Sequence, residues 1–358
     1  MKRINKLILL ISSVIVFFGV TTISVNAQDK LEGTSFSKQV KHPDNQITSG
    51  EALNLMMKPG QKQKVNVELK NYSDKEITVE AKVSGARTNG SGGIEYSPSN
   101  FKKDKSMKYD LPDLVKVPAE TKVPAKGTVD LVLDISMPET AYDGIVLGGI
   151  ELSEKGQKFE TQDEKGATIE NKIAFLFGVT LRMNKTEVKP DFKLRSVKAG
   201  LQNYRNAIIV SLGNIQNLAA KDLVLNAEIT KKGKSEVLYQ KKANDVTMAP
   251  NSIMEYPVSL DGDRMVAGDY TAHIVLKGYD KEWKWDENFK ITDEEADRFN
   301  KQDPYLVQER GLDWKMIALI VGGVLALVII VVVILKVTKK KPANKKESSS
   351  KKKSSKRK

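Results

Sequence analysis

The side chains that usually carry out catalysis are scarce in this sequence of 358 residues. It has no cysteine and only two histidines, His42 and His273, which are far apart in the chain. The short motifs of serine hydrolases, zinc peptidases and phosphate-binding loops do not occur in it. A pair of carboxylates can hydrolyse a glycosidic bond, and the residues that we consider for that role are Asp110, Asp113, Glu120 and Asp143. Because any β-rich domain of this composition has such residues, we predict that the protein is not an enzyme and has no catalytic residue, cofactor or metal site.

Two glycine-rich segments favour the binding of a polymer or a protein, which requires only an exposed surface with hydrogen-bonding loops. Residues 88–93 contain three glycines and precede a short strand. Residues 141–150 also contain three glycines, around the centre of another strand. Glycine within a strand lets a ligand or another backbone come close, or it marks a β-bulge. The sequence leaves both interpretations open.

Trp283 and Trp285 are two residues apart and therefore lie on one face of a strand. Paired aromatic rings of this kind stack on a sugar ring or on an aromatic side chain of a partner. They share their face with Phe289 and Ile291, which is typical of packing in a core. Both interpretations stay open, and we take the two tryptophans as candidate partner-binding residues.

Alternation of apolar and polar residues predicts β-strands throughout the middle of the chain. It runs over residues 65–69 and 77–83, and because residues 71–74 read as a turn, we expect these two strands to form a hairpin. Other alternating segments are 129–135, 173–183, 223–229, 270–276 and 283–291. Turn residues separate several of them, at 232–234, 250–252 and 261–263. The predicted fold is all-β, with two tandem immunoglobulin-like β-sandwich domains.

Both ends of the chain carry targeting signals. Basic residues precede an apolar stretch at 7–20, and residues 25–27 provide a signal-peptidase site, so we expect export and cleavage before Gln28. Met316–Leu335 is an apolar run of 20 residues, which as a helix is about 30 Å long and matches the hydrocarbon core of a bilayer. Twelve Lys or Arg residues in 336–358 oppose only Glu347. We therefore predict a single-pass protein of the cell membrane, with its N-terminus and bulk outside and its C-terminus in the cytoplasm.

The charge distribution argues against nucleic acid as a partner. Of the formal net charge of +13, the export signal contributes +3 and the tail +11, which leaves −1 for residues 28–335. The basic tail, next to the membrane, is suited to anionic lipid headgroups. An exported region of this size without cysteine is typical of a bacterial surface, and we expect that of a Gram-positive cell.

A short helix follows the last predicted strand. Thr292 and Glu295 fit a capping box, and acidic residues fill the first turn of a helix that ends before Pro304. The predicted organisation is a signal peptide (1–27), a first β-sandwich (28–185), a second β-sandwich (186–292), a membrane-proximal helix and stalk (293–315), a transmembrane helix (316–335) and a basic cytoplasmic tail (336–358).

A series of short segments resembles one known family. In the first domain they are Pro43–Gln46, Lys58–Gln61, Thr88–Gly90, Ile94–Tyr96 and Tyr142–Ile150; in the second they are Met248–Ser252, Ala267–Tyr270 and Trp283–Trp285. In their order and flanking topology they are similar to the WxL-interacting proteins of Gram-positive bacteria, from about Ser35 to the tail. The resemblance implies a peptidoglycan-binding first domain and a second domain that binds host surface components.

The resemblance also implies candidate residues and partners. The candidate peptidoglycan-binding residues are Asn45, Gln46, Asn89, Gly90, Asp143, Gly144, Gly148 and Gly149. The second domain is expected to contact WxL-domain surface proteins or host extracellular matrix. The protein is then a cell-surface scaffold or adhesion protein that holds the wall through one domain and a partner through the other.

Two other functions stay open. A single-pass receptor or sensor would transmit association through its membrane helix, where Ala318, Gly322 and Ala326 form a stripe of small residues that permits a homodimer. The tail contains no recognisable folded or catalytic module, which is evidence against a receptor. An enzyme acting on wall glycan would need a catalytic constellation, which the sequence lacks.

Overall fold

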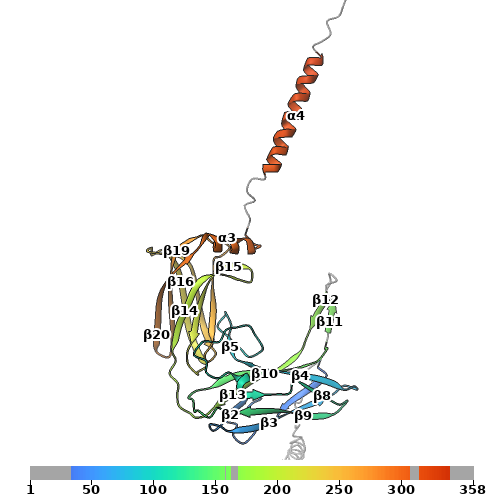
Figure 1. The fold of residues 1–358 in the computed structure, drawn as a ribbon, viewed down its shortest axis with the longest axis vertical. Helices are drawn as coiled ribbons and strands as arrows, with labels where there is room; N and C mark the ends of the chain where they lie inside the picture. Colours follow the sequence, from blue (N-terminus) through green and yellow to red (C-terminus); the bar gives the residue numbers. More distant parts are fainter. Residues whose placement is uncertain (1–33, 158, 163–167, 307–313, 339–358) are drawn as a thin grey trace, which may run out of the picture. The chain divides into compact units, whose positions relative to one another are not determined.

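The computed structural model describes residues 34–157, 159–162, 168–306 and 314–338. The predicted export signal and most of the predicted basic tail lie outside these residues. The chain divides into one unit that ends at Leu306 and another that contains helix α4 (Trp314–Thr338). The first unit consists of two β-sandwiches and a short helix, α3 (Asp293–Gln302), as Figure 1 shows.

The first sandwich packs a four-stranded sheet against a five-stranded sheet. The four-stranded sheet has the order β1 (Phe36–Val40), β3 (Lys62–Asn71), β9 (Thr128–Ser136), β7 (Val115–Lys116). The five-stranded sheet has the order β2 (Leu53–Met56), β13 (Ala174–Arg182), β10 (Val146–Glu154), β4 (Ile77–Gly85), β8 (Glu120–Val123). Smaller elements are the ribbons β5 (Arg87–Thr88) with β6 (Ile94–Glu95) and β11 (Phe159–Gln162) with β12 (Thr168–Asn171), and the helical turn α2 (Leu111–Leu114).

The expected hairpin between residues 65–69 and 77–83 is wrong. β3 pairs with β1 and β9, whereas β4 pairs with β8 and β10 in the opposite sheet. Where the chain passes from one sheet to the other, the buried Asn71 side chain donates to the carbonyl oxygens of Val123 and Pro124, at 3.1 and 3.0 Å. Alternation shows which face of a strand is buried, so strands that face each other across a core have the same pattern as strands that pair.

The second sandwich packs a three-stranded sheet against a four-stranded sheet. The first has the order β14 (Phe192–Gln202), β15 (Arg205–Asn214), β18 (Ile253–Ser259). The second has the order β17 (Val237–Met248), β16 (Ala220–Lys231), β19 (Gly268–Gly278), β20 (Lys281–Ile291). The predicted turns at 232–234, 250–252 and 261–263 connect β16 to β17, β17 to β18 and β18 to β19.

The two sandwiches have separate hydrophobic cores. The buried residues of the first core run from Phe36 to Leu181, and those of the second begin at Phe192. The prediction of an all-β chain with two sandwiches is therefore confirmed. The immunoglobulin-like topology and the boundary at residues 185/186 stay predictions. Both cores lie within the unit that ends at Leu306, since their buried residues run from Phe36 to Ala296.

Helix α3 is part of the packing of the second sandwich. Thr292 and Glu295 form the predicted capping box, with Glu295 N donating to Thr292 Oγ1 at 3.2 Å and Thr292 N donating to Glu295 Oε2 at 3.1 Å. Ala296 enters the second core. The buried Asn300 side chain donates to the carbonyl oxygen of Met265 and accepts from Met265 N, at 2.9 and 2.8 Å. These bonds fix α3 against the loop before β19.

Helix α4 is long and apolar enough to cross a membrane. Its candidate span, Ala318–Lys336, has a mean hydropathy of 3.4, and none of it is buried within the described residues. The predicted small-residue stripe of Ala318, Gly322 and Ala326 lies on this helix. A homodimer through this stripe stays a prediction.

Candidate functional site

The two sandwiches meet through main-chain hydrogen bonds, at a region that we call the junction. It comprises residues 88–106 and 143–145 of the first sandwich, and Arg195, Asn217 and residues 246–255 of the second. Lys103 and Ser252 form an antiparallel β-bridge. On either side of it, Asp104 N donates to Asn251 O at 2.7 Å and Ile253 N donates to Lys102 O at 2.9 Å.

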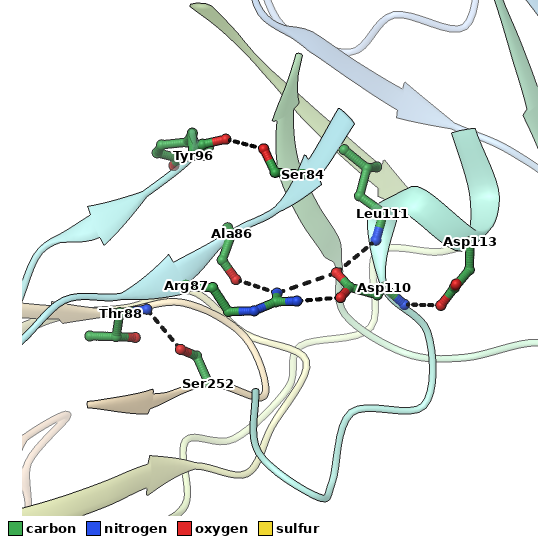
Figure 2. Close-up of polar contacts among 9 residues, drawn as sticks. All are labelled: Ser84, Ala86, Arg87, Thr88, Tyr96, Asp110, Leu111, Asp113 and Ser252. Atoms are coloured by element: carbon green, nitrogen blue, oxygen red, sulfur yellow. Dashed lines mark hydrogen bonds and ion pairs between the residues drawn. The ribbon is translucent and has the colours of Figure 1, made fainter. Parts of the chain in front are cut away.

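The first glycine-rich segment, 88–93, lies in the junction. Thr88 N donates to Ser252 Oγ at 2.7 Å, as Figure 2 shows, and Thr88 Oγ1 accepts from Ala249 N at 3.0 Å. Gly92 O accepts from both the backbone nitrogen and the hydroxyl of Thr247, at 2.8 and 3.1 Å. This loop therefore binds the neighbouring sandwich along its length.

An ion pair inside the first sandwich orients this loop. Arg87 lies immediately before Thr88, and its guanidinium contacts both carboxylate oxygens of Asp110 (Figure 2). Asp110 is also the N-cap of α2, where it accepts from Leu111 N at 3.0 Å, and Asp113 completes a capping box. Two of the acidic residues considered for glycoside hydrolysis are thus engaged in structural contacts.

A buried ion pair crosses the junction. Arg195, on β14, donates from Nε to Asp104 Oδ2 at 2.7 Å and from Nη2 to Oδ1 at 2.6 Å. The Asp104 side chain is 0% exposed and that of Arg195 is 19% exposed. Burial acts to raise the pKa of Asp104, but Arg195 and hydrogen bonds from Ser106 outweigh it, so that the pKa lies below its ordinary value. The charged pair is therefore the stable state at neutral pH.

The second glycine-rich segment reaches the junction at its beginning. Ile145 N donates to Asn217 O at 2.8 Å, and Asn217 Nδ2 donates to Asp143 O at 3.0 Å. Gly144 has φ +82°, and a Cβ built on it would lie 2.1 Å from Asn217 O. Any side chain here would both strain the backbone and push the sandwiches apart.

The predicted peptidoglycan-binding residues fall into three places. Asn89, Gly90, Asp143 and Gly144 lie in the junction. Gly148 and Gly149 lie within β10, where a Cβ would collide with the carbonyl oxygens of Ser84 and Tyr96 respectively.

The third place is the loop before β2, which holds Asn45 and Gln46. The Asn45 amide is bonded to Met56 O and to the Gln63 side chain. The Gln46 amide is bonded to the backbone of Thr48, Ala52 and Asn54. Both side chains therefore shape their own loop.

A groove of about 650 Å³ runs beside the junction and is lined by both sandwiches. The first sandwich contributes Asn89, Gly90, Ser91, Phe101 and Lys102. The second contributes residues 198–203 of β14 and its turn, Ile209, Glu255, Pro257 and Phe299 of α3. Sequence reasoning found Asn89 and Gly90 but missed Phe101, Lys198 and Phe299, because no local pattern relates these residues.

The two candidate tryptophans differ in their surroundings. Both are half-buried against the second core. Trp283 packs edge-on against Phe192, with ring centroids 4.9 Å apart. Trp285 lines a second, smaller pocket of about 370 Å³ together with Arg195, Lys284 and Asp286. Trp285 is therefore the better placed of the two for contact with a partner.

One arrangement with the appearance of catalytic chemistry was not anticipated from the sequence. His273 Nδ1 lies 2.6 Å from Asp286 Oδ1, and His273 Nε2 lies 3.3 Å from Thr230 Oγ1. Thr230 is only 2% exposed, so a substrate cannot approach its hydroxyl from solvent. Across the described part of the chain, no group of three or more His, Cys, Asp or Glu residues is arranged to hold a metal ion.

The sequence matches two family models. Residues 36–154 match the model described as WxL Interacting Protein, peptidoglycan binding domain. Residues 164–301 match the model described as WxL Interacting Protein, host binding domain. The second match begins before the second sandwich, since it includes β13, which lies in a sheet of the first. Both descriptions are of binding domains of a cell surface.

No curated protein matches the chain. Among solved structures, the YadV chaperone is similar over 72% of this chain and 100% of its own, with 10% identity and a TM-score of 0.26. The CupB2 chaperone of Pseudomonas aeruginosa is similar over 63% of this chain and 91% of its own, with 14% identity and a TM-score of 0.24. The PapD-like domain of human CEP192 is similar over 47% and 99%, with 11% identity and a TM-score of 0.25. At these TM-scores the similarities carry no conclusion.

Replacing Asp104 by Asn should lower the free energy of unfolding of the two-sandwich unit by about 3 kcal/mol near neutral pH, because it leaves the Arg195 guanidinium without its counter-charge. Since the pKa of Asp104 is depressed in the folded protein, the pair contributes its full stability above the unfolded pKa of about 4 and loses it as the pH falls through the folded pKa. Urea unfolding at a series of pH values should show the two proteins converging in acid. Asp74→Asn, at an exposed ion pair, is the control, and equal stability of the Asp104 variant and wild type at pH 7 would contradict the assignment.

Gly144→Ala should be much more destabilising than Gly233→Ala. Both glycines have positive φ, +82° and +73°, so both substitutions carry a backbone cost of about 1 kcal/mol. Only the Cβ at position 144 meets the neighbouring sandwich, because nothing lies within 4 Å of the corresponding Cβ at Gly233. Thermal unfolding measures the difference, and equal losses at the two positions would show that the junction tolerates a side chain at residue 144.

Proposed function

Because the chain belongs to the WxL Interacting Protein family, we propose that it is a membrane-anchored scaffold of the bacterial cell surface. In this proposal the first sandwich binds peptidoglycan, and the second binds WxL-domain surface proteins or host extracellular matrix. The observation that supports it best is the junction, whose β-bridge and buried ion pair hold two binding domains in one body. A scaffold needs this property, since it presents two ligands at a fixed separation.

Anchoring would come from α4, which has the length and hydropathy of a membrane span. We propose that it crosses the membrane once, with the sandwiches outside and the basic tail against anionic lipid in the cytoplasm. A protein held in this way meets wall and partner at a high effective concentration. Contacts that are individually weak therefore suffice to keep all three attached.

We propose that Trp285 is part of the partner-binding surface. It is half-buried against the second core and lines its pocket together with the charged side chains of Arg195, Lys284 and Asp286. A ring in this position adds apolar area to an interface with little loss of side-chain freedom. Trp283 packs edge-on against Phe192 instead.

The two attachments can be separated by enzymatic digestion of the wall in whole cells. The full chain should stay with the membrane after the peptidoglycan has been digested. A chain that ends at Leu306 should be recovered with the wall and released by the same digestion, because the sandwiches still bind peptidoglycan while the membrane span is missing. Purified protein ending at Leu306 should also sediment with isolated peptidoglycan. Protein that remains in the supernatant would contradict the wall-binding role.

Trp285→Ala should weaken the binding of a purified WxL-domain surface protein, or of host matrix protein tested in parallel, by at least about tenfold. Lys290→Ala changes an exposed residue of the same strand and should leave binding unaltered. Surface plasmon resonance with the protein ending at Leu306 measures both. Equal affinities for the two variants would place the partner surface elsewhere.

A further inference from the structure

We propose that the groove beside the junction is a glycan-binding site built by both sandwiches, and that its ligand is the N-acetylated sugar backbone of peptidoglycan. The inference rests on the proposed wall-binding function and assigns it a location. It differs from a division of labour in which the first domain alone binds the wall. Ten of the fifteen residues that line the groove belong to the second sandwich and α3.

The two walls of the groove are joined by close contacts between the sandwiches, which set its shape. Gly90, on the first-sandwich wall, approaches the second sandwich so closely that a Cβ would lie 2.7 Å from Glu255 O. The side chains of Lys102 and Glu255 form an ion pair across the same seam, at 2.6 Å. Because the groove is already formed, binding a polymer does not require the protein to lose conformational entropy around it.

The apolar part of the lining suits the faces of sugar rings and the methyl groups of acetamides. Phe101 is 42% exposed at the edge of the groove, although a large aromatic side chain is normally covered. Ile209 and Phe299 are half-buried and extend the apolar surface across the second sandwich and α3. Pro257 also lines the groove and is buried. Aromatic and aliphatic groups spread along an open groove can contact successive sugars of a strand.

The polar part of the lining suits hydroxyl and amide groups. Asn89, Ser91, Gln202 and Asn203 provide neutral donors and acceptors on both walls. Asn89 uses Oδ1 to hold its own loop, accepting from Ser91 N and Gly93 N at 3.0 Å each. Its Nδ2 therefore has a fixed position from which to donate to a ligand. Polar groups of this kind, placed among apolar contacts, fix the orientation of a ligand in its site.

The charge of the groove limits how much negative charge its ligand can carry. Lys102 is neutralised by Glu255. Lys198 is exposed and, within the described residues, makes no ion pair. One uncompensated lysine matches a polymer with occasional carboxylates, such as those carried on N-acetylmuramic acid directly or through the stem peptide. A polyphosphate backbone, with a charge on every repeat, would require more cations.

The test uses protein ending at Leu306 and peptidoglycan glycan strands freed of stem peptide, with affinity measured by calorimetry. Phe101→Ala should weaken binding about five- to tenfold, through loss of one aromatic contact. Lys198→Glu should weaken it at least about tenfold, and Lys198→Gln by less, because reversal adds repulsion to the loss of attraction.

Two control variants match these changes outside the groove. Tyr279→Ala removes an aromatic ring of similar exposure, 44%, and Lys193→Glu reverses an exposed lysine on the same strand as Lys198. Both should bind the strands as wild type does. Thermal unfolding of every variant checks that the fold is kept.

The outcomes separate this inference from the proposed function. Wild-type protein that fails to sediment with whole peptidoglycan contradicts the proposed function itself. If wild type sediments with peptidoglycan but the groove variants bind glycan strands as well as the control variants do, the groove is not the binding site. The proposed wall-binding function is then unaffected. Competition by free stem peptide but not by glycan strands also overturns the inference, since the site would then recognise peptide.

Discussion

The buried pair of Asp104 and Arg195 is the interaction on which the arrangement of the two sandwiches depends. A carboxylate removed from water is tolerated only when its charge is compensated and its oxygens are hydrogen-bonded. Here the compensating guanidinium lies on the other sandwich. The two buried charges compensate each other only when the sandwiches are in this arrangement, so the pair specifies how the two sandwiches fit together.

The close contacts around this pair follow from it. Backbone approaches such as those at Gly90 and Gly144 leave no room for a side chain at this distance and orientation of the two sandwiches. The β-bridge of Lys103 with Ser252 adds direction to the contact, because main-chain hydrogen bonds fix register as well as distance. The groove is lined by both sandwiches, so it exists only when they are joined in this way. Binding in the groove would therefore require both domains.

The glycine-rich segments show what composition can indicate about a binding site. Their composition indicated an approach by a ligand or by another backbone. At Gly148 and Gly149 the approaching group is backbone of the first sandwich itself. At Gly90 and Gly144 it is backbone of the second sandwich, and the loop that carries Gly90 also lines the groove. A residue type that permits close approach does not specify what approaches, so the composition alone left the question open.

Local patterns in the sequence determined the all-β class, the capping box of α3, the principal turns and the apolar helix α4, because each depends on residues that are neighbours in the chain. Strand pairing was decided only by the tertiary structure: β3 and β4 looked like a hairpin but face each other across a core. The same holds for the groove, whose lining residues Asn89, Phe101, Lys198 and Phe299 come from distant segments. Their proximity depends on a junction between two folded domains, and no periodicity or spacing in the sequence encodes it.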